Sequence, residues 1–312
     1  MNEVPAEPGA RPAPAGARSG LVALVGRANV GKSTLMNRVL GEKVSIVSDV
    51  VQTTRNLVRG VLTEERGQLA FLDTPGIHKA QHDLGRIMNR TARAAIKGSD
   101  VALMLVDGSS RPREEDEGWL RRLTGYDAAC VIACNKSDQG TSFLQVYRDL
   151  WEKVAMEKES VLAPRWMTIS ARDGSGIEAL VALLFDLVPE GPALFPADVL
   201  TDFPRNWTIA DVVREKLFAQ LKQELPHAVA VKIDSIDESD DRWNVRADVL
   251  VDRPSQKGIV IGHKGRLLRT AKRQAEAELS EMYERTVNLE LWVKVERNWA
   301  QNHWILKQLG YV

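Results

Sequence analysis

A loop with a glycine near each end, placed between an apolar run and a helical segment, constrains this chain more than any other feature. The loop, Gly26–Ser33, follows Leu21–Val25 and leads into Thr34–Leu40. A strand, a loop and a helix in this order direct backbone N–H groups at the helix N-terminus toward an anion, and the glycines allow phosphate to approach. The loop fits the Walker A pattern in full, so we predict a nucleoside triphosphate site here.

In this pattern Lys32 reaches the β and γ phosphates, and Ser33 ligates Mg²⁺. The predicted contacts in the loop are Gly26, Arg27, Ala28, Asn29, Val30, Gly31, Lys32, Ser33 and Thr34.

Length and composition indicate an ordinary globular protein of about two domains. The chain has 312 residues, of which 44% are hydrophobic and 27% charged, and its 42 basic residues balance its 42 acidic ones. Overall charge therefore indicates neither nucleic acid nor membrane, and no apolar run is long enough to span a bilayer. Cys130 and Cys134 lie four apart in a strand-like run, too far apart to bridge, so we expect reduced core thiols and a cytoplasmic protein.

Short apolar runs alternate with helical patterns after a tail rich in Pro, Ala and Gly, which we expect to be disordered over residues 1–19. This alternation predicts an α/β domain over residues 20–188, with a mainly parallel sheet and helices on both faces. The expected strands are 21–25, 57–62, 69–72, 101–106, 129–133 and 166–169. The expected helices are 32–40, 84–97, 114–123, 143–156 and 177–187.

A proline-rich stretch, residues 189–204, predicts a linker to a second domain over residues 205–312. In that domain the sequence predicts a helix over 209–225 and strands over 229–233 and 243–249, followed by a short apolar run at 259–261. A glycine-flanked turn at 262–265, a helix over 266–282, a strand over 287–295 and a last helix over 298–309 follow.

Two further segments identify the base of the nucleotide. Asn135, Lys136, Ser137 and Asp138 follow an expected strand, where an aspartate accepts hydrogen bonds from both N1–H and the exocyclic amine of guanine. Adenine has no such pair of donors, so a carboxylate here discriminates strongly. The end of the last strand, Ser170, Ala171 and Arg172, is placed to give a backbone N–H to guanine O6.

Two segments are expected around the γ-phosphate. Asp73, Thr74, Pro75 and Gly76 close a strand, so Asp73 would act on Mg²⁺ through water and the Gly76 N–H would sense the γ-phosphate. The loop before the second strand carries Thr54, whose hydroxyl would complete the magnesium shell; Thr53, one position away, leaves that choice open.

These five segments, in this order, resemble a small GTPase domain of the translation-factor-related class. Such domains hydrolyse GTP by positioning and electrostatics, and the resemblance gives Lys32, Thr54, Gly76 and Asn29 catalytic roles. Ile77 stands where Ras-like enzymes carry a water-orienting glutamine. The resemblance is to GTPases with a hydrophobic residue there, in some of which a loop asparagine helps to bind K⁺. Asn29 is the matching residue, and its alternative role is loop geometry.

His78 and His82 lie four apart but have no evident third ligand, so we predict no metal site there.

A second motif, Gly262–Gly265, lies between an apolar run and a helix and fits the G-x-x-G loop that clamps single-stranded RNA. The interval 257–273 around it is basic and contains no acidic residue, which predicts a phosphate-facing patch; the alternative is a solvated helix face. The expected RNA contacts are Lys257, Gly262, His263, Lys264, Gly265, Arg266, Arg269, Lys272 and Arg273.

The order of elements in this half resembles an α+β type II KH domain, and a GTPase domain joined to such a domain resembles the Era family of ribosome-assembly GTPases. The resemblance implies GTP and Mg²⁺ as ligands, and binding to small-subunit ribosomal RNA near its 3′ end during maturation of the 30S subunit. It also implies a monomer with peripheral contact at the inner face of the cell membrane, of which the composition gives no sign.

Two other functions stay open: an RNA-binding assembly factor with a mainly structural GTPase domain, and a signalling GTPase whose C-terminal domain binds protein. Trp292 lies on the polar face of its strand, where it would stack on a base or, as we prefer, pack under the last helix.

Overall fold

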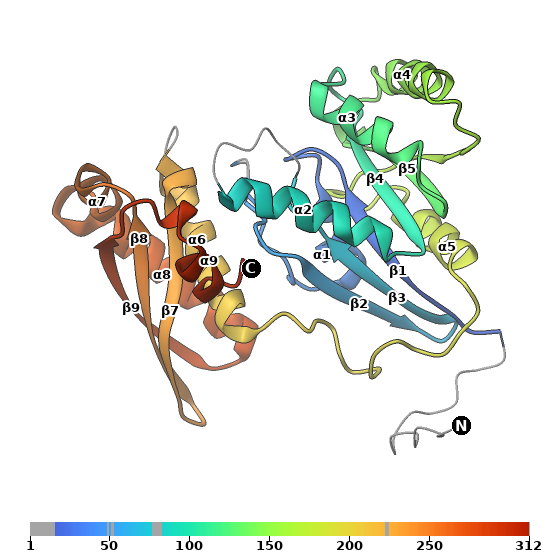
Figure 1. Ribbon diagram of the computed structural model, residues 1–312. Coiled ribbons are helices and arrows are strands. Elements are labelled where there is room, and N and C mark those ends of the chain that lie inside the picture. Colours follow the sequence, from blue (N-terminus) through green and yellow to red (C-terminus); the bar gives the residue numbers. More distant parts are fainter. Residues whose placement is uncertain (1–15, 49, 51–52, 77–82, 222–224, 312) are drawn as a thin grey trace, which may run out of the picture.

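A six-stranded sheet forms the core of the N-terminal domain in the computed structural model, which describes residues 16–48, 50, 53–76, 83–221 and 225–311 (Figure 1). The strand order is β2-β3-β1-β4-β5-β6. The strands are β1 (Arg18–Val25), β2 (Val58–Glu64), β3 (Gly67–Asp73), β4 (Val101–Asp107), β5 (Ala129–Asn135) and β6 (Arg165–Thr168). Only the β2–β3 pair is antiparallel, so the predicted α/β class with a mainly parallel sheet is confirmed.

Helices cover both faces of this sheet, because alternate residues of β1 enter two different cores. Val22 and Leu24 pack with helices α1 (Lys32–Leu40) and α5 (Ile177–Leu187). Ala23 and Val25 pack on the other face. That face is covered by α2 (Asp83–Lys97), α3 (Glu114–Leu123) and α4 (Leu144–Glu157). A 3₁₀ turn, η1 (Ser137–Gln139), follows β5.

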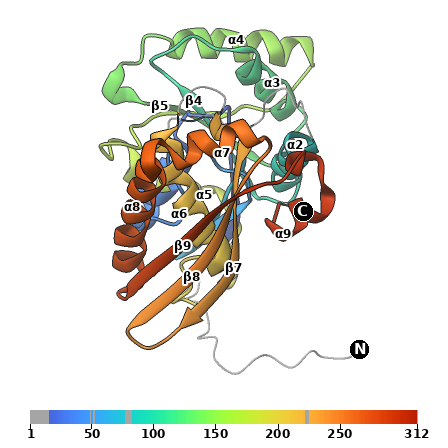
Figure 2. The ribbon, with the colours of Figure 1, turned by 90° about the vertical axis from the view of Figure 1, so that its left-hand side faces the viewer.

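The C-terminal domain has a three-stranded sheet with its three longest helices on one face and the C-terminal segment on the other (Figure 2). Strand β7 (Val229–Glu238) is antiparallel to β8 (Arg242–Val251), which is parallel to β9 (Thr286–Val295). Helices α6 (Arg205–Gln220), α7 (Pro254–Ile261) and α8 (Arg266–Tyr283) pack on one face around a single core. The remaining elements are η2 (Leu225–Ala228), η3 (His263–Gly265), η4 (Trp299–Gln301) and α9 (His303–Gln308).

Several expected boundaries are wrong. Strand β7 continues to Glu238, five residues beyond its expected end, and helix α6 ends five residues before its expected end. Strand β1 begins at Arg18, so residues 18 and 19 belong to the sheet and not to the tail. Helix α6 runs from Arg205 to Gln220, four residues earlier at its start than predicted. The apolar run 259–261 is the end of helix α7, which begins at Pro254, a residue well suited to the first helical turn. The last helix is divided at Asn302, whose side chain accepts hydrogen bonds from the amides of Trp304 and Ile305 and so starts α9 afresh.

The linker, residues 189–204, lies along the edge of the first sheet. Arg18 and Gly60 form isolated bridges with Glu190 and Thr201, and Gln68 accepts hydrogen bonds from the amides of Leu194 and Phe195. The linker is therefore fastened to the first domain.

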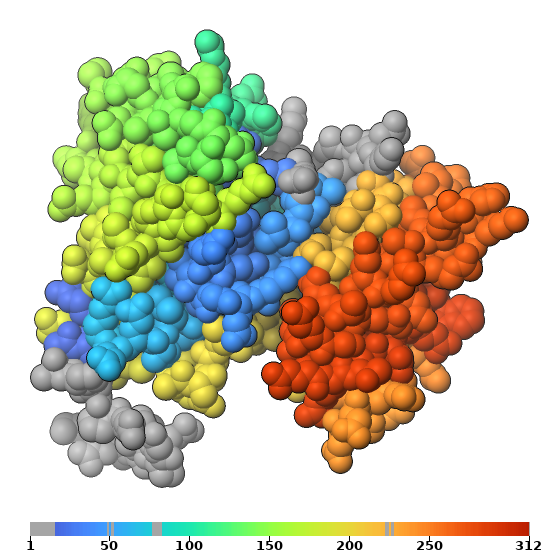
Figure 3. Space-filling model, turned by 180° about the vertical axis from the view of Figure 1, so that it is seen from behind, coloured from blue at the N-terminus to red at the C-terminus, as the bar shows by residue number. Residues whose placement is uncertain are grey.

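The two domains share an apolar interface. Leu84, Ile87 and Met88 of α2 pack with Trp299 and the residues of α9. Ile46, from the loop after α1, enters the core of the second domain. Seen from behind, the blue surface of the first domain adjoins the orange surface of the second (Figure 3). The loop after α1 is thus packed directly against the second domain.

The two cysteines lie in β5 and are buried and unbonded. Burial raises the pKa of the Cys130 thiol to about 12 and that of Cys134 to about 11, which keeps both protonated and unreactive. Over the described part of the chain, no helix is both long and apolar enough to cross a membrane.

Candidate functional site

A cavity of about 500 Å³ opens where the phosphate loop meets the ends of the parallel strands. Its lining residues are Ala28, Asn29, Gly31, Lys32, Ser33, Thr34, Ile46, Val47, Ser48, Thr53, Thr54, Gly76, Asn135, Lys136, Asp138, Gln139, Ala171 and Arg172. Most residues expected from the sequence are therefore brought together. Ile46, Val47, Ser48 and Gln139 were missed, because no motif marks them. Of the expected residues, Gly26, Arg27, Val30, Asp73, Thr74, Pro75 and Ser170 do not line the cavity.

The phosphate loop is shaped by close contacts that only a glycine permits. Gly31 has φ 101°, and a Cβ there would lie 2.3 Å from the side-chain nitrogen of Asn135. The Lys32 ammonium is buried and donates to the carbonyls of Gly26, at 3.2 Å, and Arg27, at 3.0 Å. Burial lowers the pKa of Lys32 to about 8, while the Asp73 carboxylate opposes this shift. A bound polyphosphate would supply the negative charge that stabilises this buried ammonium group.

Three side chains expected to hold Mg²⁺ converge beside the loop. The Ser33 hydroxyl donates to Asp73 Oδ2 at 2.6 Å and lies 3.0 Å from Thr54 Oγ1. The second carboxylate oxygen of Asp73 is buried and has no hydrogen-bond partner among the described residues. Two hydroxyls and a carboxylate suit a hard cation, and the unpartnered oxygen leaves a position for a metal-bound water, so these residues fit Mg²⁺.

The structure distinguishes the two threonines that the sequence left open. The Thr53 hydroxyl donates to the carbonyl of Val50, whereas the Thr54 hydroxyl faces Ser33. Ser45, which sequence reasoning missed, donates to the same Asp73 oxygen at 2.8 Å. Thr54 is therefore the residue placed to join a metal shell.

The segment after β3 lies against the phosphate loop. The Thr74 hydroxyl donates to the carbonyl of Leu24 at 2.7 Å, so this side chain fixes the backbone. A Cβ on Gly76 would come within 2.8 Å of the Ala28 amide nitrogen, which shows how closely the two backbones approach. Ile77, His78 and His82 lie outside the described residues.

The base end of the cavity is braced by Asn135. Its side chain donates to the carbonyl of Val30 at 2.7 Å and accepts from the amide of Ala171 at 2.9 Å, which ties three nucleotide-binding segments together. The exposed Asp138 carboxylate accepts from the Ser170 hydroxyl at 2.8 Å. Because the Ala171 amide already donates to Asn135, the O6 atom of a bound guanine would have to accept its hydrogen bond from a neighbouring backbone amide.

Lys136 and Arg27 both anchor the site to Asp107. The Lys136 ammonium lies 2.9 Å from the Asp107 carboxylate, and the Arg27 guanidinium lies 3.2 Å from it and 3.0 Å from Asp116. Although burial opposes the shift, hydrogen bonds from Ser109 and the Lys136 ammonium lower the pKa of Asp107 to about 2. The Arg27 side chain therefore points away from the cavity and stabilises the loop from behind, so only its backbone is available to a nucleotide.

The G-x-x-G loop joins α7 to α8, and its basic neighbours are mostly exposed. Lys257, His263, Lys264, Arg266, Arg269 and Arg273 face solvent. Lys272 is the exception, because it is half-buried and its ammonium lies 3.6 Å from Glu276, just beyond the interval free of acids. Ile259 of α7 is an exposed apolar side chain that sequence reasoning passed over.

Trp292 does not pack under the last helix, the arrangement preferred from the sequence, because 59% of it is exposed. Trp299 is buried instead and donates to the carbonyl of Ala228.

Known proteins match the chain over both domains. A family described as "50S ribosome-binding GTPase" matches residues 21–136, and a KH domain family matches residues 224–300. The GTPase Era of Geobacter sp. (strain M21) is 41% identical over 296 residues, which cover 94% of this chain and 98% of that protein. This chain belongs to the Era family of GTPases. The Era of Rippkaea orientalis is 40% identical over 301 residues, 96% of this chain and 94% of that protein.

Solved Era structures agree with the fold. Era in complex with MgGDPNP and nucleotides 1506–1542 of 16S ribosomal RNA superposes with a TM-score of 0.86 at 34% identity, and covers 95% of this chain and 99% of that one. A single-residue variant of Aquifex aeolicus Era bound to GDP.AlF4- gives a TM-score of 0.85 at 34% identity, with the same coverage. The predicted arrangement of a GTPase domain followed by a type II KH domain is thus confirmed.

In this Era-family chain, the KH domain contacts the residues on either side of Thr54. Arg214 of α6 donates to the Thr53 carbonyl at 2.8 Å. Arg55 donates to the Val229 carbonyl at 2.8 Å, and its guanidinium lies 5.5 Å from the ring centre of Trp299. Both arginines are buried. No local sequence pattern predicts these contacts, because the partners are more than 150 residues apart.

A second, more exposed group of contacts holds the loop after α1. The Lys43 ammonium lies 2.8 Å from Glu215 of α6 and 2.6 Å from Glu278 of α8, and Glu215 also accepts from the amide of Val47. The loop that lines the nucleotide cavity is therefore bonded to two KH-domain helices.

Proposed function

We propose that this chain binds GTP with Mg²⁺, hydrolyses it, and uses its KH domain to bind single-stranded small-subunit ribosomal RNA near the 3′ end during assembly of the 30S subunit. One observation carries the proposal: the loop that presents Thr54 to the phosphate site is also bonded to the KH domain by Arg214 and Arg55. The RNA partner is supported by the solved Era complex with 16S ribosomal RNA and by the basic loop at 262–265.

When bound, Mg²⁺ would neutralise charge between the β and γ phosphates, held by Ser33, Thr54 and, through water, Asp73. Lys32 would contact the same phosphates, and the Gly76 amide would register the γ-phosphate. Because Thr54 contributes only when that phosphate is present, its loop changes between the GTP and GDP states. Arg214 and Arg55 would carry the change to the KH domain.

The nucleotide state should therefore alter RNA affinity. We expect the affinity for a single-stranded RNA of the 3′-terminal sequence to differ about tenfold, in either direction, between the form with a non-hydrolysable GTP analogue and the GDP form. A tenfold change corresponds to a typical coupling free energy between two sites. Titration of labelled RNA by fluorescence anisotropy measures both constants. Equal affinity in the two states would rule out the switch and leave the two separate activities.

Two rival functions have distinct outcomes. If the GTPase domain is only structural, multiple-turnover hydrolysis is absent; the converged Lys32, Ser33, Asp73 and Asp138 argue against this. If the KH domain binds protein, charge reversal at Lys264 and Arg269 leaves RNA binding unchanged.

Potassium stimulation is a further part of the proposal, resting on Asn29. We expect GTP hydrolysis in KCl to exceed that in NaCl by about tenfold, because a cation beside the phosphates would stabilise charge that develops in the transition state. Asn29→Ala should remove the difference. Asn29 has φ 62°, so Asn29→Gly is the matched variant that keeps the loop shape but lacks the amide. If Asn29→Gly keeps the stimulation, Asn29 serves loop geometry alone; equal rates in both salts for the parent would exclude potassium altogether.

We also infer a cytoplasmic protein, supported by the unbonded, buried Cys130 and Cys134. That the protein is a monomer stays a prediction from the family. Peripheral contact with the inner face of the cell membrane stays a prediction from the family.

A further inference from the structure

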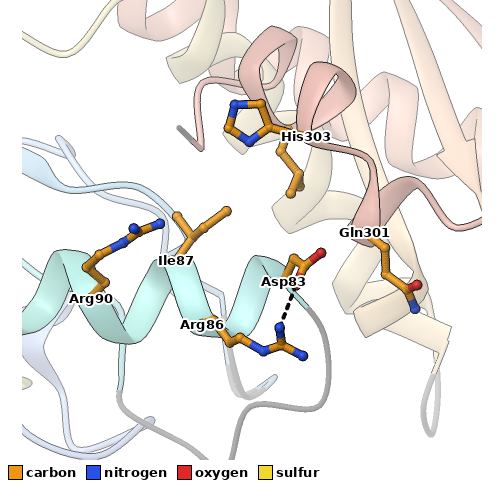
Figure 4. Close-up of a pocket in the computed structure, with 7 residues that line it drawn as sticks. Asp83, Arg86, Ile87, Arg90, Gln301 and His303 are labelled. Atoms are coloured by element: carbon orange, nitrogen blue, oxygen red, sulfur yellow. Dashed lines mark hydrogen bonds and ion pairs between the residues drawn. The ribbon is translucent and has the colours of Figure 1, made fainter.

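A cleft of about 410 Å³ separates α2 of the GTPase domain from the C-terminal segment of the KH domain (Figure 4). Asp83, Arg86, Ile87 and Arg90 line one wall, and Gln301, His303 and Leu306 line the other. Ile87 and Leu306 are buried members of the apolar cluster that joins the domains, so the cleft has an apolar floor and a polar rim. Neither the phosphate site nor the G-x-x-G loop contributes to it.

Helix α2 presents a row of basic side chains that continues beyond this cleft. We call Arg86, Arg90, Arg93 and Lys97 the α2 stripe; all four are exposed, and their spacing of three or four residues places them on one face. At 1.5 Å per residue the stripe is about 16 Å long. Asp83 is the only acidic residue in α2, and it pairs with Arg86 at 3.0 Å.

Helices α3 and α4 of the same domain pair basic side chains with acidic ones. Arg121 of α3 pairs with Glu117 at 2.7 Å, and Lys153 of α4 pairs with Glu157 at 3.9 Å. By contrast, Arg90, Arg93 and Lys97 form no salt bridge with any described residue. Like charges one turn apart destabilise a helix, so the stripe costs stability unless an anion neutralises it.

Neighbouring elements add to the positive potential. Burial, and then the nearby Arg93 charge, lower the pKa of Arg122 on α3. Across the cleft, His303 and Lys307 lie one turn apart on α9 and are both exposed. Trp304, beside His303, is 66% exposed. Basic side chains next to an exposed aromatic ring are typical of surfaces that bind single-stranded nucleic acid.

We propose that the cleft and the α2 stripe bind the phosphodiester backbone of the same RNA strand that the KH domain holds, as a second contact that involves both domains. This inference rests on the RNA binding proposed above. An extended row of guanidinium groups matches successive phosphates, and the apolar floor of Ile87 and Leu306 accommodates a nucleobase. In Figure 1, α7, which leads into the G-x-x-G loop, lies at the outer end of the KH domain, away from α2 and α9.

The test compares RNAs of two lengths on the full-length protein with a GTP analogue. The short RNA has about four nucleotides, the number that a G-x-x-G loop clamps, and the long RNA is the single-stranded 3′ end of the small-subunit ribosomal RNA. Arg90→Glu with Arg93→Glu should weaken binding of the long RNA about tenfold and leave the short RNA unaffected. The salt dependence, d log K/d log [salt], should become shallower by about 1.4 for two lost phosphate contacts.

Two control variants distinguish this inference from the proposed function. Lys153→Glu with Lys158→Glu makes the same charge change near the end and at the C-cap of α4 and should leave both RNAs unaffected, whereas Lys264→Glu should weaken both. If the α2 variant binds long RNA normally while Lys264→Glu does not, the second contact is wrong and the KH function stands. If neither variant weakens binding, the RNA function itself fails.

Equal losses for both RNAs, or an equal loss in the α4 variant, would show a general charge effect and also overturn the second contact. A melting temperature that does not fall, together with an unchanged GTPase rate, shows that the α2 variant is folded.

Discussion

Asp138→Asn is expected to change the nucleotide preference from guanine to xanthine, with a change of about 10⁴-fold in the ratio of the two affinities. A site built to form hydrogen bonds discriminates to this extent against a ligand that lacks the matching groups. Asp138 is exposed in the cavity and oriented by the Ser170 hydroxyl at 2.8 Å. Its carboxylate accepts the two donors of guanine, whereas an asparagine amide has one donor and one acceptor and matches N1–H and the C2 carbonyl of xanthine. Affinities for fluorescent GDP and xanthosine diphosphate measure the change.

Asp173→Asn is the matched control. Asp173 lies in the neighbouring loop, where its carboxylate accepts from the Ser175 amide at 2.8 Å, and it does not line the cavity. This variant should keep the preference for guanine. If Asp138→Asn instead weakened both nucleotides equally, Asp138 would only support the loop, and the base specificity would have to come from another residue.

The nucleotide site was predictable because its chemistry is local in sequence. The phosphate loop, the Asp73 segment and the Asn135 segment each follow a buried strand, and parallel strands bring their carboxyl ends to one edge. The sequence favoured Thr54 over Thr53 only weakly, because the choice depends on which hydroxyl the loop turns toward Ser33.

The failures have a different cause, which is contact between distant segments. Arg27 is part of the phosphate-loop motif, but its side chain is drawn away by Asp107 and Asp116, about 80 and 89 residues later. Helix α7 is too short to show a helical period around its three apolar residues. Trp292 and Trp299 could not be told apart, because burial at each depends on how the C-terminal segment folds back over the sheet.

The hydrogen bonds between the domains show most clearly that contacts between distant segments cannot be predicted from local sequence. Arg214 lies in an expected amphipathic helix, in which a charged residue normally faces solvent. Instead only 1% of its side chain is exposed, because it donates to the Thr53 carbonyl and the Tyr311 hydroxyl and lies 2.8 Å from Asp211. Burying an arginine costs desolvation energy, and the contacts of its two terminal nitrogens offset that cost only while all of these partners stay in place.

Arg214→Met should therefore destabilise the folded protein by about 3–5 kcal/mol, because it leaves the Asp211 carboxylate buried without its partner and the Thr53 carbonyl without a donor. Urea denaturation measures the loss. The affinity for Mg²⁺ with a GTP analogue should fall as well, because the Thr54 hydroxyl loses its fixed position, while the affinity for GDP should change less. A variant that lost stability but kept both affinities would show that Arg214 does not position Thr54.

Two further variants distinguish the effect of the unpaired buried charge on stability from the effect of losing an arginine side chain. Arg205→Met makes the same substitution on the same helix, where Arg205 forms an exposed pair with Glu238 at 2.7 Å, and should cost less than about 1 kcal/mol. Asp211→Leu with Arg214→Met removes both buried charges and should recover much of the loss.

The pH dependence gives an independent check. Burial raises the pKa of Asp211 in the folded state even though Arg214 and Arg55 oppose it, and this rise is larger without Arg214. The folded variant then binds a proton that the unfolded chain releases, so its stability increases as the pH falls below the raised folded-state pKa toward the unfolded pKa of about 3.9. The difference in free energy of unfolding between Arg214→Met and the parent should accordingly become smaller at acidic pH. A difference that stays constant with pH would mean that an unpaired Asp211 is not its cause.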